Sequence, residues 1–448
     1  MAQVQPSVVS LGGGLILNKD VFSMSPGEAL QLRNFEPDIE GGYKKVLGTT
    51  KYNTNICPQV SASTERVVFT AIFNDVVLAG RGGSIHRASS GSGSWTSTIT
   101  SLGTPTQNYE HRLFNFDGTD KIVITTGTSN PQILNTSFST TVVNATGTSN
   151  FKFVEIFKNH IFFAGHSSNI QEVSFMGPNQ TNDFTSGNGG GTIKVDAEVV
   201  GLRAFRDSLI IFGKDKIFKL TGTSVSNFAI TPITRNIGCT DGRSIQELGG
   251  DVIFLAPDGL RTIAGTARIG DVELSSISRK ILPLINNLLD NISSFTISSM
   301  VIRERSQYRL FYFQSGQAAS SQKGIIGTFK FDANGVPAFE WSETLGMEIK
   351  RCTSDLDVNN KEVQFGSNET GYVYQLDTGN NFDGSNISAQ FQTPDMDYGD
   401  NGLRKSLYAV KANIEPEGTN NNLKLLIRYD FESTEVPQPG SFNVGNLS

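Results

Sequence analysis

Residues 200–220 read VGLRAFRDSLIIFGKDKIFKL, the clearest example of a pattern that recurs along this chain. A short apolar stretch ends at the polar pair Arg206–Asp207, and the apolar run Ser208–Phe212 follows. A Gly-Lys-Asp turn then leads into the alternating stretch Lys216–Leu220. Apolar runs of this length, bounded by Gly, Asp and Asn, predict β-strands joined by tight turns. The pattern therefore indicates a β-hairpin unit.

This pattern occurs seven times. Its polar pairs begin at Asn74, Thr119, Lys158, Arg206, Gly249, Ser306 and Asn359, which gives spacings of 45, 39, 48, 43, 57 and 53 residues. Most of these values lie near the period of about 40–50 residues that is typical of β-propeller blades. A hairpin buries a sheet face only by stacking on its neighbours, and a ring of such units removes most exposed edges. We therefore predict an all-β chain whose residues 66–385 form a β-propeller of six or seven blades.

Two further features of the ring follow from this reading. We place the polar pair at the turn between the second and third strands of each blade. Residues 1–65 have turns at Pro26–Gly27 and Gly41–Gly42 but few long apolar runs. We expect this N-terminal segment to contribute to ring closure, through a strand paired with the last blade, and to subunit contacts.

One insertion, at about residues 273–292, has helical rather than β periodicity. Its apolar side chains lie on one face of a helix: Ile277, Ile281, Leu284, Ile285, Leu288, Leu289 and Ile292. Ser275 or Ser276 is a candidate N-cap, and Pro283 predicts a kink or two short helices. The insertion has two readings, a helix packed on the propeller rim or a contact with a neighbouring subunit.

The texture changes after about residue 386. We predict a small β platform element over residues 386–432, with strands at 387–393, 407–414 and 423–429 and a turn at 418–422. Pro394 ends the first of these strands. Residues 433–448 contain Pro437 and Pro439 and are predicted to form an extended C-terminal arm.

The composition narrows the classes of function. The 448 residues carry 37 basic and 43 acidic side chains, a net charge of −6, without a dense Lys/Arg tract. Tight nucleic-acid binding by charge neutralisation is therefore not expected. A surface that DNA passes without adhering agrees with this charge, because like charge repels phosphate.

Cysteine usage and apolar runs point to a protein that is neither disulfide-stapled nor membrane-bound. Cys57, Cys239 and Cys352 are odd in number and far apart, so we interpret them as small buried side chains. Residues 1–14 lack the basic start and apolar run of a signal peptide, and no apolar run approaches a membrane span of about 18 residues.

Candidate catalytic residues are few. None of the four histidines, His86, His111, His160 and His166, lies in a zinc or nucleophile motif. Asp207, Asp251 and Asp258 lie near predicted turns; propeller glycosidases place carboxylates around a funnel, but turn capping is the simpler reading.

Three weaker motifs complete the search. Ser90–Trp95 has the texture of an Asp-box turn without its Asp, and Gly189–Gly191 lacks the strand and helix of a dinucleotide loop. Asp355, Asp357 and Asn359 have the opening spacing of a calcium loop, but Asn360 and Gly366 stand where its Gly and Glu should be. We therefore expect no catalytic residue, no cofactor and no metal ion.

Several stretches resemble a known family. They are GGGL (12–15), PGEALQLRNF (26–35), GGYKK (41–45), VELSSISRKI (272–281), FQTPDMDYG (391–399) followed by Arg404–Lys405, and RYD (428–430). In this order the chain resembles the tail nozzle, tail tubular or packaged-DNA stabilisation proteins of short-tailed bacteriophages. These stretches run in order from near the N-terminus to near the C-terminus, so the resemblance spans most of the chain.

The resemblance implies a structural protein of the virion tail, made in the host cytoplasm. It implies a β-propeller with a β platform, six copies of which form a homohexameric ring below the portal and adaptor. Such a head–tail connector ring continues the DNA exit channel used in DNA ejection and helps retain the genome. The implied partners are further copies of itself, the portal–adaptor proteins, tail fibres or spikes, and packaged DNA that passes without specific binding. No membrane partner and no catalytic residue come with the family.

Two other functions remain open at this level. One is a propeller that binds or cleaves surface glycan, and the other is a different tail component such as a fibre hub. For the nozzle hypothesis, we expect rings of Asp and Glu to face the lumen of the assembled ring and repel DNA phosphates.

Overall fold

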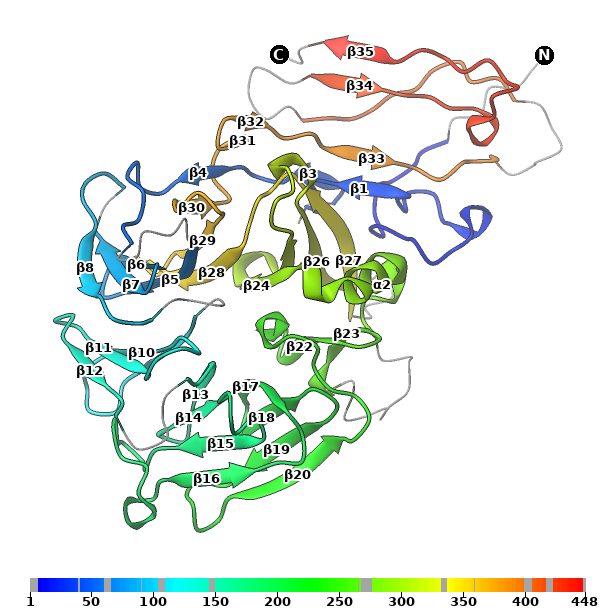
Figure 1. The fold of residues 1–448 in the computed structure, drawn as a ribbon. Coiled ribbons are helices and arrows are strands. Elements are labelled where there is room, and N and C mark those ends of the chain that lie inside the picture. The colour runs from blue at the N-terminus through cyan, green and yellow to red at the C-terminus, as the bar shows by residue number, and fades with distance from the viewer. Residues whose placement is uncertain are drawn as a thin grey trace.

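The computed structural model is an all-β molecule arranged as a ring of sheets (Figure 1). It describes residues 7–38, 41–59, 66–89, 91–103, 109–144, 150–264, 266, 276–331, 337–357, 359–398, 405–415 and 422–445. The sheets follow one another around the ring in chain order, each antiparallel within its blade. The predicted β-propeller is confirmed, and the number of blades is seven.

The first four blades each have four strands. They are β5 (Val67–Phe73), β6 (Val76–Arg81), β7 (Ser84–Ala88) and β8 (Thr96–Ile99); β9 (Glu110–Phe114), β10 (Lys121–Thr125), β11 (Gln132–Asn135) and β12 (Thr140–Val142); β13 (Phe153–Phe157), β14 (His160–Ala164), β15 (Glu172–Phe175) and β16 (Gly191–Lys194); and β17 (Val199–Phe205), β18 (Ser208–Gly213), β19 (Ile217–Thr221) and β20 (Ala229–Thr234). The sequence pattern marked the first three strands of each unit, and the fourth strand had no apolar signature.

The last three blades depart from this plan. Their strands are β21 (Gln246–Leu248), β22 (Asp251–Ala256) and β23 (Gly259–Thr262); β24 (Thr296–Ile302), β25 (Gln307–Phe313), β26 (Lys323–Phe331) and β27 (Pro337–Leu345); and β28 (Arg351–Leu356), β29 (Glu362–Ser367) and β30 (Val373–Leu376). Within the described ranges, the fifth blade has three strands and the seventh takes its fourth strand from elsewhere in the chain.

Strands from the N-terminal segment complete and extend the sixth and seventh blades. β4 (Thr49–Lys51) pairs with β30 in antiparallel fashion, and this pairing closes the ring. β1 (Gln31–Arg33) joins β27, and β33 (Gln390–Gln392) joins β1. The short strands β31 (Asn381–Phe382) and β32 (Ser385–Asn386) follow β4, while β2 (Phe35–Pro37) and β3 (Tyr43–Lys45) pair with each other.

The polar pairs lie at the turn between the first and second strands of each blade, not between the second and third as predicted. Asn74–Asp75, Lys158–Asn159 and Gly249–Gly250 all have positive φ at both positions. Two successive residues with positive φ are what a tight type I′ hairpin turn requires. The pattern therefore located a turn correctly but shifted the strand count by one, because it began on the innermost strand.

Seven hydrophobic clusters hold the ring together, one at each junction between neighbouring blades. Phe69 and Ile122, for example, lie in the cluster between the first and second blades. Val67 and Phe365 lie in the cluster between the first and seventh. Because every blade buries both faces against its neighbours, the core is distributed around the ring.

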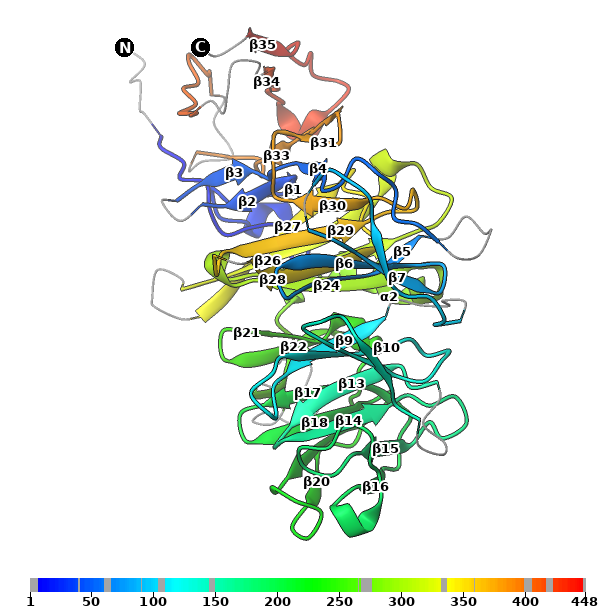
Figure 2. The same ribbon diagram turned by 90° about the vertical axis from the view of Figure 1, so that its left-hand side faces the viewer.

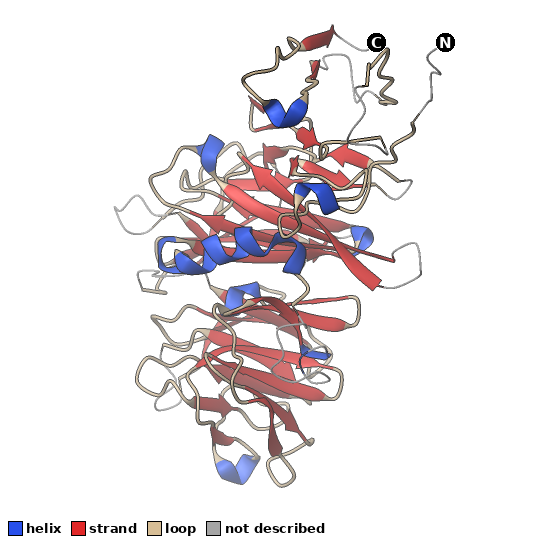
Figure 3. Cartoon of the chain, turned by 90° about the vertical axis from the view of Figure 1, so that its right-hand side faces the viewer, coloured by secondary structure: helices blue, strands red, loops and turns tan. Residues whose placement is uncertain are grey.

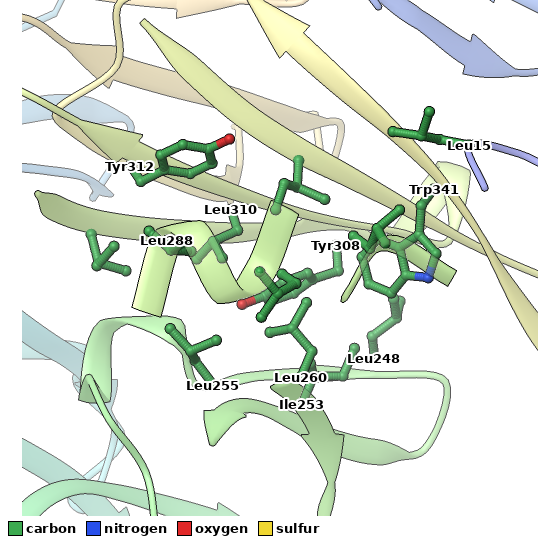
Figure 4. Packing of buried hydrophobic residues seen from close by; sticks show 14 of the residues in the cluster. Leu15, Leu248, Ile253, Leu255, Leu260, Leu288, Tyr308, Leu310, Tyr312 and Trp341 are labelled. Atoms are coloured by element: carbon green, nitrogen blue, oxygen red, sulfur yellow. The ribbon is translucent and has the colours of Figure 1, made fainter. Parts of the chain in front are cut away.

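The largest cluster joins the fifth and sixth blades and includes the predicted helix (Figures 3 and 4). The helix α2 spans Leu282–Asp290, with the short 3₁₀ turns η5 (Arg279–Ile281) before it and η6 (Ile292–Ser294) after it. Pro283 occupies the first turn of α2, where a missing N–H costs little, so it starts the helix rather than kinking it.

The helix packs on the rim of the ring. Ile285 and Leu288 are buried in one cluster with Trp341 and other side chains of the fifth and sixth blades. Ser276 is not the N-cap: the cap residue is Ile281, without a side-chain hydrogen bond. Ser275, the other proposed cap, lies outside the described residues.

The C-terminal strands lie beyond β33 and β1, outside the sixth and seventh blades (Figures 1 and 2). Here β34 (Leu423–Leu425) pairs with β35 (Phe442–Gly445). Residues 407–414 belong to no strand, and the tail folds back through β35 instead of extending away, so two details of the predicted platform were wrong. Among the described residues, no strand pairs with the alternating stretch 407–414.

Candidate functional site

The first strands of the blades surround an axial channel, which holds a cavity of about 240 Å³. Its wall comes from β9, β13, β17, β24 and β28, together with the 3₁₀ turn η3 (Gly242–Ser244) and the start of β21. A smaller cavity of about 160 Å³ shares Glu110, Phe153 and Arg243 with it and continues the channel. The first strands of seven blades cannot meet at the axis of the propeller, so a cavity remains there.

Charged side chains line this channel. Five arginines contribute to its wall, Arg112, Arg203, Arg243, Arg303 and Arg351, against two carboxylates, Glu110 and Asp355. They come from different blades and are far apart in the sequence, so only closure of the ring brings them together.

Two of the arginines are well paired. Arg112 Nε lies 2.9 Å from Glu155 Oε2, and Arg112 Nη1 lies 3.7 Å from Glu110 Oε2. Arg243 binds Asp241 with two nitrogens, Nε to Oδ1 and Nη2 to Oδ2, each at 3.0 Å. These pairs neutralise charge locally and fix the two guanidinium groups.

The other three arginines are poorly paired. Arg203 Nη2 lies 3.9 Å from Glu247 Oε2, and Arg303 Nη1 lies 3.7 Å from Glu362 Oε1. Across the described part of the chain, no carboxylate comes within ion-pair distance of Arg351, although this residue is only 8% exposed. The channel thus carries positive charge that its own carboxylates do not neutralise.

Burial is the largest cause of the pKa shifts of two channel residues, His111 and Asp355. Burial, followed by the charges of Arg351 and Arg112, holds the pKa of His111 well below its usual value. Burial also raises the pKa of Asp355 to about 6, although Arg351 and Arg303 act against this and Ile72 N donates to its Oδ2 at 3.1 Å. His111 is therefore neutral and Asp355 titrates near pH 6.

The aspartates singled out in the sequence lie in hairpin turns away from this channel. Asp207 is highly exposed and pairs with Lys158 Nζ at 3.2 Å. Asp251 Oδ1 accepts a hydrogen bond from Ala264 N at 2.9 Å, and Asp258 accepts one from Arg261 Nε at 2.8 Å. Asp207 thus pairs with the neighbouring blade, Asp251 with a residue beyond β23, and only Asp258 within its own hairpin, so the three do not converge on one site.

The calcium-like spacing is also broken up by the fold. Asp355 faces the channel, whereas Asp357 accepts from the backbone N–H of Asn359 and Lys361. Among the described residues, no group of three or more His, Cys, Asp or Glu side chains is placed to hold a metal ion.

The remaining motifs are structural. Gly190 packs so closely that a Cβ there would lie 2.5 Å from the carbonyl carbon of Phe184. Trp95 Nε1 donates to Asn55 O at 3.0 Å, while Ser90 lies outside the described residues. The three cysteines are buried free thiols, and burial raises the pKa of Cys57 and Cys239 to about 12.

The N-terminal stretch 26–35 attaches the N-terminal segment to the sixth blade. Asn34, with φ of 51°, accepts from Leu345 N and donates to Leu345 O and Ser388 O, at 2.8–2.9 Å. Gly27 has φ of 96°, and a Cβ there would lie 2.1 Å from Ser10 O. The residue types in this stretch are thus explained by docking, without a ligand.

Sequence reasoning missed the arginines of the channel. Arg112, Arg203 and Arg351 each lie on the first strand of a repeat unit, and Arg303 directly follows such a strand. The available signal was a charged residue within the first strand of a repeat unit. This signal indicates a channel residue only when the position of the propeller axis is known.

Comparison with known proteins adds little. No protein-family model and no curated protein matches this chain. Among solved structures, it is similar to Raptor from Chaetomium thermophilum (10% identity, TM-score 0.42, covering 80% of this chain and 30% of that one). It is also similar to a quinonprotein alcohol dehydrogenase-like protein from Bacteroides thetaiotaomicron (10%, 0.39, 64% and 70%) and to PorZ from Porphyromonas gingivalis (12%, 0.40, 79% and 40%).

Because these TM-scores lie below 0.5, the fold assignment depends on the sheet topology, and none of the three structures indicates a function for this chain. Within its described residues, no helix is long and apolar enough to cross a membrane.

Proposed function

We propose that this chain is a structural protein of a short-tailed phage tail. Six copies form a nozzle ring below the portal and adaptor, continue the DNA exit channel and help to retain the packaged genome. Tail fibres or spikes are further partners. The family resemblance of the stretches at 12–15, 26–35 and 41–45, together with those at 272–281 and 391–399, supports this proposal.

The proposed self-assembly is supported by one exposed apolar stretch near the C-terminus. Residues 407–415 form an extended run that belongs to no strand and exposes Leu407, Tyr408, Val410 and Ile414, with Tyr408 74% exposed. A contiguous exposed apolar surface of this kind is typical of a protein–protein contact. A second copy of this chain would supply the neighbouring strand or sheet face that is missing within one chain.

The experiment is native mass spectrometry and electron microscopy of the purified protein, alone and with its portal–adaptor complex. Val410→Asp places a charge in the exposed run, and Val225→Asp is the matched control, since both valines are 47% exposed. We expect wild type and Val225→Asp to form a six-fold ring that docks under the adaptor, and Val410→Asp to remain monomeric with an intact propeller.

Other results would count against the proposal. A monomer that binds polysaccharide would favour a glycan-binding propeller, and a trimer would favour a fibre hub. A ring whose DNA-facing lumen is basic would remove the expectation that acidic side chains repel the DNA there.

A further inference from the structure

We infer that the axial channel of the propeller binds a phosphate-type oxyanion between Arg203 and Arg351, with Arg303 at its edge. This site is independent of the tail function proposed above, because all of its residues lie within one chain. It would take either inorganic phosphate or the phosphate group of a small monoester.

The strongest evidence is the state of Arg351. Its side chain starts from β28, is 8% exposed, and has a buried Nε without a hydrogen-bond partner. A buried charge that is neither paired nor hydrogen-bonded is costly, so proteins normally provide a partner. A bound anion in the cavity that Arg351 lines would supply that partner.

Arg203, which lines the same cavity, also has a buried Nε without a hydrogen-bond partner. It lies on β17, and its nearest carboxylate oxygen is 3.9 Å away on Glu247. Burial lowers the pKa of Arg203, the positive charges of Arg112 and Arg303 lower it further, and Glu155 and Glu247 act in the opposite direction. The net shift is downward, so the nearby carboxylates do not fully offset the burial of this guanidinium group.

Two other arginines that line the same cavity have close carboxylate partners, and this distinguishes them from the arginines of the proposed site. Arg112 and Arg243 line the same cavity, yet Glu155 and Asp241 hold them at 2.9 and 3.0 Å. The fold therefore provides carboxylate partners for some channel arginines and leaves Arg203 and Arg351 open. The poorly paired guanidinium groups on β17 and β28 therefore do not reflect a general shortage of acidic residues, and we interpret them as an anion-binding arrangement.

The chemistry favours phosphate. A guanidinium group presents a planar set of N–H donors that matches the oxygens of phosphate, often with two parallel hydrogen bonds. The cavity of about 240 Å³ has room for inorganic phosphate or a small monoester, whereas Asp355 and Glu110 on its wall disfavour a larger polyanion.

The test is titration of the full-length protein with inorganic phosphate, followed by ³¹P NMR line broadening and calorimetry. The variants are Arg203→Gln and Arg351→Gln, singly and together. Arg206→Gln is the control, because Arg206 is an exposed turn residue that donates to Gly250 O at 3.0 Å outside the channel. Circular dichroism and thermal unfolding without phosphate show whether each variant is folded.

We expect wild type and Arg206→Gln to bind phosphate equally, with a Kd of about 1 mM or tighter. Each channel variant should bind about tenfold more weakly, which is typical for the loss of one hydrogen-bonded charged group. Glycerol phosphate in a parallel titration separates the two sources: equal affinity favours the free ion, and tighter binding favours a monoester.

Two results would overturn the inference. One is the absence of saturable line broadening in the wild type. The other is equal phosphate binding by the wild type and a folded double variant, which would leave only the general stabilising effect of phosphate as an excluded salt. If the double variant does not fold, the single Arg351→Lys variant, which keeps the charge but loses the planar fork, should still bind more weakly than wild type.

Discussion

The buried ion-pair network around Arg309 is expected to determine how firmly the N-terminal segment holds the ring closed. Arg309, on β25, is fully buried and donates from Nη2 to Glu36 Oε2 at 3.0 Å and from Nη1 to Asp377 Oδ1 at 2.8 Å. Glu36 belongs to β2 in the N-terminal segment, and Asp377 directly follows β30 of the seventh blade. One guanidinium group thus connects the N-terminal segment with the last two blades.

The loss of unfolding free energy expected for Arg309→Met depends on the ion pairs that remain around Glu36 and Asp377. Burial alone would lower the pKa of Arg309, but Asp377 and Glu36 outweigh it and raise the pKa, so the group is charged. Breaking a buried pair by removing one partner costs about 3–5 kcal/mol. We expect about 3 kcal/mol, the lower end, because Arg305 Nη1 still lies 3.0 Å from Glu36 and 3.2 Å from Asp377.

Arg305→Met is the matched comparison, since Arg305 contacts the same two carboxylates but its side chain is 24% exposed. Its removal should cost about 1 kcal/mol or less, as for partly exposed pairs. The assay is denaturant unfolding followed by the fluorescence of the fully buried Trp341. The double variant Arg309→Met/Glu36→Gln completes a mutant cycle, and we expect a coupling energy above about 1 kcal/mol.

The reasoning is refuted if Arg309→Met costs no more than Arg305→Met, or if the effects of Arg309→Met and Glu36→Gln are simply additive. Either result would mean that the N-terminal segment is held by backbone pairing and apolar contacts alone.

Two more predictions concern stability. The folded protein keeps the Asp355 proton to about pH 6, whereas an unperturbed Asp releases it near 3.8. The free energy of unfolding should therefore fall as the pH rises from 4 to 6, by at most about 3 kcal/mol. The side chain of Asp355 is partly exposed, and solvent screening reduces this value. Asp355→Asn should remove this fall and be more stable than wild type at pH 8; parallel pH profiles of the two proteins in denaturant unfolding would contradict it. Gly327→Ala would place a Cβ 2.4 Å from the Cζ3 atom of Trp341 and should lower the free energy of unfolding by about 1–3 kcal/mol. The control Gly187→Ala has no atom within 4 Å of the new Cβ and should be nearly neutral. Equal unfolding midpoints for the two variants would show that the Trp341 ring moves aside freely.

Much of the ring was readable from the sequence. Most inner hairpins have a second strand that is largely buried, so an apolar run follows each tight turn, as in Val76–Ala79. Stacking of blades imposes this requirement at every repeat, and the spacing of the turns therefore predicted a propeller of six or seven blades, while the structure decided on seven. The helical stripe ending at Ile292 was visible for the same reason, since one face of α2 is buried.

Other features were decided only by the tertiary structure. The outermost strand β12 has three exposed residues, and the closing strand β4 reads Thr-Thr-Lys, because backbone hydrogen bonds hold these strands whatever their side chains. The pairing of β4 with β30 joins residues more than 300 positions apart. Likewise, Arg203 and Arg351 are unremarkable in the sequence and acquire a shared environment only when the ring closes. Local apolar patterning thus determined the repeating unit, while ring closure, which depends on long-range backbone pairing, determined which charges meet at the axis.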